Sequence, residues 1–524
     1  MKINHLNTSS GRRLALLAVS ASGILLLAAP ALAAQGPVPA PAIPGVAPLA
    51  GPLAAPATPA ASMGVLKTTP DLGIAGRAMT VSGAGLPAGK DVQIVWMTSS
   101  VSWVLDPRAD SVDYIGRKVD KFGVVIGTLR TDASGRFTFA GKTPRDFGGI
   151  HDIFAVVDGV QVAKGGFLIE RRMWLTPRRG PIGTPITVHF TGLGSSLYES
   201  AGALYYDNKY TGVYTANTTR GEATFVIRAA GPVGQHQIVS GPAITVNYLN
   251  VPQSPLPWET TFNLAFTTTK DAGPPKPRTD WPVDVAATVA PSTTFDQARL
   301  TTGASGVTAK LSSTTGTVLS KTDLSANGLT AGQPVTLQWG TVVGNRVNCT
   351  GQCWSITSVP LGSGTAAADG SLSRTLTIPD NLGGWHVIQL VQEGQVKAQV
   401  PYFVTRSVIR VSPQRVKAGQ PFTVQLKGVG WTQLDNTVAV TYDNGYVGYG
   451  CGFNSNGDVL LNLIATGAPG THLIDLYPLL YTQNPPYLNA VYGMVPFLSY
   501  ARDAPGLSLG YRLPAIRLAI EVVA

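Results

Sequence analysis

A short motif, Gly-x-His-x-Ile, occurs four times and constrains the fold of this 524-residue chain more than any other feature. The four copies begin at Gly149, Gly234, Gly384 and Gly470. Their histidines, at positions 151, 236, 386 and 472, are 85, 150 and 86 residues apart. Self-similarity at a fixed offset marks duplicated structural units, so the spacing indicates two pairs of modules.

The two halves of the chain also repeat one another. From Pro177 to His236, residues recur without a gap 236 positions later, at Pro413, Asp443 and His472 among others. We interpret this match as the duplication of a unit of two modules.

Short alternating runs separated by glycine turns dominate the sequence after Val65. Met79-Thr80-Val81, Ile186-Thr187-Val188 and Phe422-Thr423-Val424 each follow a proline and a glycine, and a Gly-x-Gly pair comes next in each case. Alternation with a period of two predicts half-buried β-strands. We find no amphipathic helical stretch of useful length after residue 33. The sequence therefore predicts an all-β protein.

The order of these signals resembles bacterial Ig-like repeats, including IPT/TIG-type domains. The resemblance implies β-sandwich modules and a role at the cell surface, since such domains occur in adhesins, surface layers and accessory regions of secreted enzymes. The predicted fold is all-β, with four tandem Ig-like β-sandwiches in two duplicated halves, each half with a C-terminal strand-bearing arm. The predicted segments are a signal peptide (1–33), a Pro/Ala-rich linker (34–64), modules 1 (65–171) and 2 (172–250), an arm and connector (251–310), modules 3 (311–406) and 4 (407–480), and a C-terminal arm (481–524).

Residues 1–33 have the three parts of an export signal. Lys2, Arg12 and Arg13 precede an apolar run from Leu14 to Leu27, and Ala31-Leu32-Ala33 offers a small-residue cleavage site. No second long apolar run follows, so we expect no transmembrane anchor in the mature chain. The predicted location is secreted or at the cell surface.

The content of charged residues limits the kinds of molecule that this chain is expected to bind. Charged residues make up only 13 % of the chain, so little like-charge repulsion opposes close packing of copies. The net charge of +10 is too diffuse to indicate nucleic acid, although it favours acidic polymers. Arg171-Arg172 and Arg178-Arg179 either contact an acidic polymer or form a solvated junction between modules.

The three cysteines suggest one small disulfide loop. Cys349 and Cys353 are four positions apart and could pair in an oxidising compartment, while Cys451 is left over, either free or paired elsewhere.

No metal site, cofactor or catalytic motif is predicted, because the four repeated histidines fall in separate modules and zinc needs three or four converging ligands. We expect each histidine to pack and form hydrogen bonds at a sandwich edge.

Aromatic residues supply the candidate ligand-binding positions. A Tyr-Asp-Asn-x-Tyr-x-Gly motif in both even modules predicts a two-residue hairpin with Asn208-Lys209 or Asn444-Gly445 at its turn, since asparagine and glycine tolerate positive φ. Its tyrosines form either a platform for sugar rings or a neighbouring subunit, or ordinary cross-strand packing. Long insertions in the odd modules, around residues 97–130 and 340–364, are either binding loops or solvated hairpins. The candidate ligand-binding residues are Trp103, Tyr206, Tyr210, Trp354, Tyr442 and Tyr446.

The last strand of the chain is the candidate assembly element. Ile516, Leu518, Ile520 and Val522 share one face, and the strand could complete a sheet in its own half or in a neighbouring molecule. The predicted function is an exported, non-catalytic, self-assembling structural protein such as a surface-layer, sheath or filament subunit. The alternative is an extracellular glycan-binding or cell-wall-polymer-binding protein or adhesin. The predicted partners are therefore further copies of the chain or a cell-surface polymer, without nucleic acid.

Overall fold

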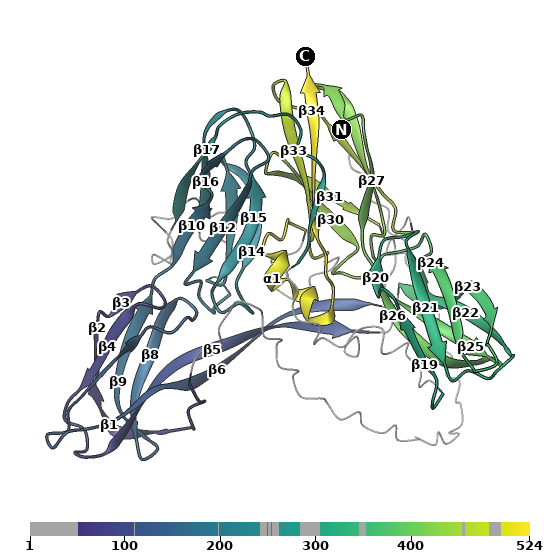
Figure 1. Ribbon diagram of the computed structural model, residues 1–524. Coiled ribbons are helices and arrows are strands. Elements are labelled where there is room, and N and C mark those ends of the chain that lie inside the picture. The colour runs from purple at the N-terminus through teal and green to yellow at the C-terminus, as the bar shows by residue number, and fades with distance from the viewer. Residues whose placement is uncertain are drawn as a thin grey trace, which may run out of the picture. The chain divides into compact units, whose positions relative to one another are not determined.

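The computed structural model describes residues 51–108, 111–197, 199–241, 249, 253, 261–282, 304–344, 353–452, 456–481 and 494–524. Every described residue belongs to one compact unit, which lies within residues 40–524. The predicted signal peptide lies outside the described residues. Strands dominate the described part, in four groups of two sheets, which confirms the predicted all-β sandwich class (Figure 1).

Module 1 contains the first nine strands. The larger sheet has the order β1-β9-β8-β5-β6, with β3 also on β9, and the smaller has the order β2-β4-β7. Trp96, Ile153 and Phe167 belong to the apolar core that both sheets supply. The strands are β1 (Thr58–Val65), β2 (Lys67–Thr69), β3 (Leu72–Gly73), β4 (Ala78–Gly83), β5 (Asp91–Pro107), β6 (Val112–Arg130), β7 (Phe137–Lys142), β8 (Gly149–Val157) and β9 (Val160–Ile169).

Module 2 repeats this plan. Its sheets have the orders β10-β12-β15 and β11-β17-β16-β13-β14. The strands are β10 (Arg172–Thr176), β11 (Arg179–Gly180), β12 (Pro185–Thr191), β13 (Ala201–Tyr206), β14 (Lys209–Thr215), β15 (Ala223–Arg228), β16 (Gly234–Gly241) and β17 (Phe262–Thr268).

Modules 3 and 4 follow the same topology. Module 3 has the sheets β19-β21-β24 and β20-β26-β25-β22-β23, while module 4 has β27-β29-β32 and β18-β34-β33-β30-β31, with β28 also on β34. The strands of module 3 are β19 (Thr308–Leu311), β20 (Thr315–Gly316), β21 (Lys321–Asn327), β22 (Pro334–Gly344), β23 (Trp354–Thr365), β24 (Leu372–Thr377), β25 (Gly384–Gln392) and β26 (Gln395–Val404). Those of module 4 are β18 (Arg278–Asp280), β27 (Ser407–Ser412), β28 (Arg415–Lys417), β29 (Pro421–Lys427), β30 (Thr437–Tyr442), β31 (Gly445–Cys451), β32 (Val459–Ile464), β33 (Gly470–Tyr477) and β34 (Ala515–Val523), and the short helices α1 (Tyr500–Asp503) and η4 (Pro505–Leu509) precede β34.

The Pro/Ala-rich stretch is not a linker over its whole predicted length. Strand β1 lies within it and pairs in parallel with β9. Just before β1, the Ala54 amide donates to the Gly123 carbonyl and the Val125 amide to the Pro52 carbonyl. Small residues such as Ala54 and Ala57 can approach the sheet closely, and both pack against a small apolar cluster with Val95 and Val125. The described residues from 51 onward therefore belong with module 1.

The two predicted arms supply sheet strands as well. Strand β17 pairs antiparallel with β16, and β34 pairs antiparallel with β33, so each completes the larger sheet of the module that precedes it. The boundaries predicted at residues 250 and 480 therefore cut through modules 2 and 4. In modules 1 and 3 the corresponding strands follow after a tight turn, at Asp158-Gly159 and Glu393-Gly394, whereas modules 2 and 4 insert a long segment there.

The insertion around residues 97–130 forms a two-stranded ribbon. Strands β5 and β6 stay paired from Asp91 with Arg130 to Pro107 with Val112, and they extend well beyond the rest of their sheet (Figure 1). The corresponding pair in module 3, β22 and β23, is shorter. Residues at the outer end of the first ribbon, Val112 and Tyr114, are buried in a cluster with residues of modules 2 and 4, so this ribbon is not a solvated hairpin.

Candidate functional site

The repeated histidines of the odd modules each span two carbonyl groups. His151 has Nδ1 2.8 Å from the Met97 carbonyl oxygen and Nε2 2.7 Å from that of Phe147. His386 repeats this arrangement with Gly340 at 3.0 Å and Leu382 at 2.9 Å. Each ring also stacks on a buried tryptophan, Trp96 or Trp339, with centroids 4.4 Å apart in both cases.

The even modules replace one carbonyl with a carboxylate. His236 Nδ1 lies 2.5 Å from Asp207, and His472 Nδ1 lies 2.6 Å from Asp443. The Nε2 atoms lie near the carbonyl oxygens of Pro232 and Ala468, four residues earlier. The repeated motif thus ties the loop before its strand to a neighbouring strand or turn. Among the described residues, no group of three or more His, Cys, Asp or Glu side chains could hold a metal ion.

The protonation of His472 depends on these neighbours. Burial lowers its pKa, but the hydrogen bond and charge of Asp443, with smaller contributions from the Ala468 carbonyl and Asp271, outweigh burial and raise the pKa above 6.5. The Asp443 carboxylate also accepts a bond from the Leu473 amide at 2.9 Å, which fixes the turn against the strand.

The tyrosine motifs form the predicted two-residue hairpins, one position earlier than expected. Tyr206 pairs with Lys209, and Tyr442 pairs with Gly445. The turn residues are therefore Asp-Asn rather than Asn-Lys or Asn-Gly. Asp207 and Asn208 have φ of 49° and 63°, and their equivalents in module 4 have 48° and 61°, as a type I′ turn requires.

The first tyrosine of each motif faces its own module. Tyr206 is 1 % exposed, and its hydroxyl donates to the Ala230 carbonyl at 2.9 Å. Tyr442 makes the equivalent bond to the Thr466 carbonyl at 2.8 Å. Both rings lie beside the motif histidine of their module. The prediction that Tyr206 binds a ligand is wrong, because its ring is buried and its hydroxyl is already bonded.

The second tyrosine of each motif lies where the two halves meet. The rings of Tyr210 and Tyr446 approach edge to face, with centroids 6.3 Å apart. The Tyr446 hydroxyl donates to the Met494 carbonyl at 2.5 Å, and the Asn444 side chain donates to the Arg228 carbonyl at 2.7 Å. These hairpins thus contact the duplicated half rather than standing open as a platform.

The predicted tryptophans also make internal contacts. Trp103 donates from Nε1 to the Asp503 carbonyl at 2.8 Å and packs edge to face against Tyr114 and Phe497. Trp354 is 2 % exposed and belongs to the same apolar cluster, so a ligand-binding role for its ring is contradicted. The cluster takes residues from all four modules and the C-terminal arm.

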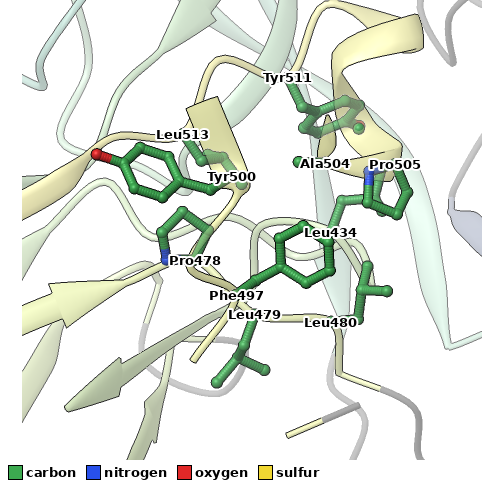
Figure 2. A pocket seen from close by; sticks show the side chains of 11 residues that line it. Leu434, Pro478, Leu479, Leu480, Phe497, Tyr500, Ala504, Pro505, Tyr511 and Leu513 are labelled. Carbon is green, nitrogen blue, oxygen red and sulfur yellow. The ribbon is translucent and has the colours of Figure 1, made fainter. Parts of the chain in front are cut away.

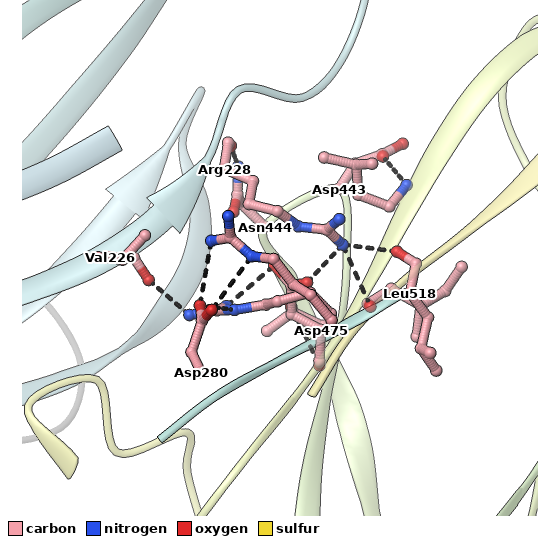
Figure 3. Close-up of polar contacts among 12 residues, drawn as sticks. Val226, Arg228, Asp280, Asp443, Asn444, Asp475 and Leu518 are labelled. Atoms are coloured by element: carbon pink, nitrogen blue, oxygen red, sulfur yellow. Dashed lines mark hydrogen bonds and ion pairs between the residues drawn. The ribbon is translucent and has the colours of Figure 1, made fainter. Parts of the chain in front are cut away.

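A buried ionic network joins modules 2 and 4 (Figure 3). Arg228, at the end of β15, lies 2.5 Å from Asp475 and donates to the Leu518 carbonyl at 2.6 Å. Arg517, on β34, lies 3.2 Å from Asp475 and 2.8 Å from Asp280 of β18. Both arginines are almost completely buried. We call Arg228, Asp280, Asp475 and Arg517 the central network.

The contacts around Arg517 satisfy its buried charge. It donates to the Tyr477 hydroxyl at 2.6 Å and to the Val226 carbonyl at 2.9 Å, and its guanidinium lies 4.7 Å from the Tyr477 ring centroid. Burial lowers the pKa of Arg517, but Tyr477, Asp475, Tyr500 and Asp280 outweigh burial and raise the pKa well above its ordinary value. The side chain therefore stays charged in the folded protein.

The C-terminal arm docks on module 2 through Asp503. Its buried carboxylate accepts bonds from the amides of Asn217 and Thr218 at 2.7 Å each, and from the hydroxyls of Thr215 and Thr218. Next to it, the Val213 amide donates to the Pro496 carbonyl, and the Leu498 amide donates to the Val213 carbonyl. The arm of the second half thus adds to the edge of β14, while β18, from the arm of the first half, adds to the edge of β34.

Both edges of the predicted assembly strand are paired with strands of the same chain. Strand β34 is flanked by β33 on one side and by β18 and β28 on the other. Ile516, Leu518, Ile520 and Val522 lie in the core of module 4. Within the single chain, the strand therefore completes the sheet of its own half.

A small cavity lies where the arm covers module 4 (Figure 2). It measures about 20 Å³, and its lining is mostly apolar, with Leu434, Phe497 and Leu513 among the side chains around it. A volume of this size holds about one water molecule and no substrate.

The cysteines differ in state. Cys353 is disulfide-bonded, while its predicted partner Cys349 lies outside the described residues. Cys451 is a free thiol at the end of β31, and burial raises its pKa to about 12.

Sequence reasoning missed the central network and Asp503. A signal for both arginines was present, because Arg228 ends the strand Ala-Thr-Phe-Val-Ile-Arg and Arg517 interrupts Ala-Ile-Arg-Leu-Ala-Ile. A charged residue within an apolar strand indicates a buried partner, since an unpaired buried charge is costly. Nothing comparable marked Asp503, which lies in an irregular segment.

Comparisons with known proteins give only distant similarities. No known protein family matches the sequence, and no curated protein matches it either, so the IPT/TIG resemblance stays a prediction. Similar solved structures include invasin, a bacterial integrin-binding protein (12 % identity, 81 % of this chain and 77 % of that one, TM-score 0.18). Others are the Escherichia coli adhesin FdeC (14 %, 68 % and 99 %, 0.15) and a putative membrane-anchored protein from Corynebacterium diphtheriae (11 %, 65 % and 88 %, 0.17). Because all three TM-scores are low, these similarities carry no argument about function.

In the described part of the chain, no helix is long and apolar enough to cross a membrane.

Proposed function

We propose that this protein is an exported, non-catalytic structural protein of the cell surface, in which the two duplicated halves are locked into one rigid unit. The observation that carries the proposal is the reciprocal exchange of arms between the halves. Strand β18 of the first half lies on β34, and the segment around Phe497 of the second half lies on β14. Tandem sandwiches that act only as a flexible chain have no need of such an exchange.

The buried polar contacts support a rigid role. Arg517 of one half bonds to Val226 and Asp280 of the other, and Asp503 reaches the backbone of Asn217 and Thr218. Buried charges must be met by well-placed partners, so these contacts allow few alternative arrangements of the halves.

Export and surface location rest on the sequence. The leader at residues 1–33 and the low content of charged residues, 13 %, suit a protein outside the cell. We expect surface labelling of intact cells that produce the protein to modify it, whereas recovery only from the cytosol would overturn the proposal.

Self-association as a surface-layer, sheath or filament subunit belongs to this proposal. Removing residues 514–524 cannot test it, because that change removes a core strand of module 4. Light scattering of the signal-free protein across concentration tests it directly. A mass that stays that of one chain at all concentrations would exclude self-assembly while leaving the surface location open.

The alternative is an extracellular polymer-binding protein. It would have to bind the polymer with residues other than the aromatic candidates predicted from the sequence. Tyr206 and Trp354 are buried, and Trp103, Tyr210 and Tyr446 make contacts between parts of the chain. One surface of module 2 does favour such binding.

A further inference from the structure

Three planar side chains stack on the outward face of the three-stranded sheet of module 2. Trp174 of β10 pairs directly with His189 of β12, and their rings are parallel within 7° with centroids 4.8 Å apart. The guanidinium of Arg172, two residues before Trp174 on the same strand, lies 5.3 Å from the indole centroid. Arg172 is exposed, and Trp174 and His189 are partly exposed.

Two further arginines lie near this sheet: α1, which carries Arg502, contacts β15, and the charge of Arg145 acts on Glu222, directly before β15. Arg502, on α1, is close enough for its charge to act on His189 and on Glu222, and Arg145 also acts on Glu222. We call Arg145, Arg172, Trp174, His189 and Arg502 the basic strip.

The arginines of the basic strip form no close ion pair among the described residues, although the charges of two of them act on Glu222. Arg145, Arg172 and Arg502 form no ion pair within 4 Å there, although other exposed bases do, such as Lys118 with Asp120 at 2.9 Å. Glu222 and Asp503, the residue after Arg502, are nearby acids, and the three arginines exceed these two carboxyl groups. The strip therefore carries uncompensated positive charge in a chain with few charged residues.

The chemistry of the strip selects the partner. Guanidinium groups and the indole N–H only donate hydrogen bonds, so the strip matches a ligand rich in acceptors and negative charge. Planar guanidinium groups fit carboxylates in a bidentate manner, and an indole offers apolar surface to a sugar ring. A carboxylate-bearing sugar polymer combines both features.

We propose that the basic strip is a binding site for an acidic polysaccharide. Arg172 and Arg502 bind carboxylates of the polymer, and Trp174 contacts a sugar between them. This activity is separate from the proposed structural role, because Arg172, Trp174 and His189 take no part in the central network, although Arg502 directly precedes the docked Asp503 on α1.

The duplication supplies an internal control. On the equivalent face of module 4, Arg410 pairs with Gln425, and Leu460 follows on β32. Arg410 and Leu460 are exposed, but the tryptophan and the histidine are missing. Binding should therefore depend on module 2 and not on module 4.

The test uses the signal-free chain and immobilised polygalacturonate, with dextran as the neutral polymer and duplex DNA as a different polyanion. We expect binding to polygalacturonate that weakens with added salt, and none to dextran. Arg172→Ala should weaken binding about tenfold, the loss expected for one charge-assisted contact. Trp174→Ala should weaken it by about the same factor through the lost ring contact with the sugar, whereas Arg410→Ala should leave binding unchanged. Arg172→Lys keeps the charge but not the planar donor, and it should bind less well than the unaltered protein.

Several outcomes would overturn the proposal. Absence of binding at low salt would do so, as would equal losses for Arg410→Ala and Arg172→Ala, since diffuse charge would then explain binding. Binding to DNA as strong as to polygalacturonate, with the same dependence on Trp174, would show a general polyanion surface instead. All substituted side chains are at least partly exposed, and near-ultraviolet circular dichroism checks that each variant is folded.

Discussion

Tyr210 and Tyr446 hold the same position in the two duplicated halves, and their rings meet edge to face with centroids 6.3 Å apart. The hairpins that carry them, β13–β14 and β30–β31, thus contact each other across the junction of the halves. The contact is between copies of one motif, so the junction follows the symmetry of the duplication. The arms break that symmetry, because β18 lies on the edge of β34 and the second arm lies on the edge of β14.

Removing the acid of the central network should destabilise the protein strongly. Asp475→Ala leaves Arg228 and Arg517 with less compensation in a buried site, and we expect the free energy of unfolding to fall by about 3–5 kcal/mol. Denaturant unfolding measures the change. Asp120→Ala is the matched control, because it breaks an exposed pair with Lys118 and should cost less than about 1 kcal/mol. Equal losses for the two variants would contradict a buried, structural role for Asp475.

Removing the carboxylate of Asp503 should release the arm from module 2. Asp503→Ala leaves the amides of Asn217 and Thr218 without their acceptors, which we expect to cost about 3 kcal/mol. Hydrogen exchange at these two amides should become faster than in the unaltered protein. Asp503→Asn keeps one acceptor oxygen, so its exchange rates at these amides should lie between those of the unaltered protein and those of Asp503→Ala. Unchanged protection in Asp503→Ala would show that the arm is held by other contacts.

The contribution of His472 should depend on pH. Its pKa is raised in the folded protein, so the stabilisation from the protonated ring is complete below the pKa of the unfolded chain and is lost as pH rises through the folded value. His472→Ala should therefore cost more free energy of unfolding at about pH 5.5 than at about pH 8.5. The variant Asp443→Asn should lose most of this pH dependence. A cost that is equal at both pH values would refute the assignment.

The thiol of Cys451 should react slowly in the folded protein. Burial raises its pKa to about 12, and the thiolate is the reactive form. We expect slow labelling by a disulfide reagent at neutral pH and fast labelling after unfolding in denaturant. Cys451→Ser gives the background. Equally fast labelling of folded and unfolded protein would show that the thiol is accessible and ionised.

The sequence predicted the local structure of this protein well. Alternating runs such as Ile186-Thr187-Val188 became strands because one face of each is buried, and the Asx-rich turn of the tyrosine motif formed because its residues tolerate positive φ. The histidines pack and form hydrogen bonds as expected, because one partner of each ring is the carbonyl oxygen of the residue four positions earlier.

The long-range contacts escaped prediction for a physical reason. Asp503 bonds to residues more than 280 positions earlier, and Arg517 reaches back to Val226 across 291 positions. No periodicity or turn signal records such distances. The same limit explains Trp103 and Tyr446, whose aromatic character was evident but whose partners in the C-terminal arm were not. Strand β1 was missed because its small residues and proline are typical of a linker.

The central claim is that the two halves hold each other without help from the segment that joins them. Its most direct test places a specific protease site within residues 291–300 of the otherwise complete chain, which is folded first and cleaved afterwards. We predict that the two fragments elute together at the mass of the intact protein, and that they separate when Asp475→Ala and Asp503→Ala are combined. Fragments that separate at once on cleavage of the unaltered protein would contradict the claim.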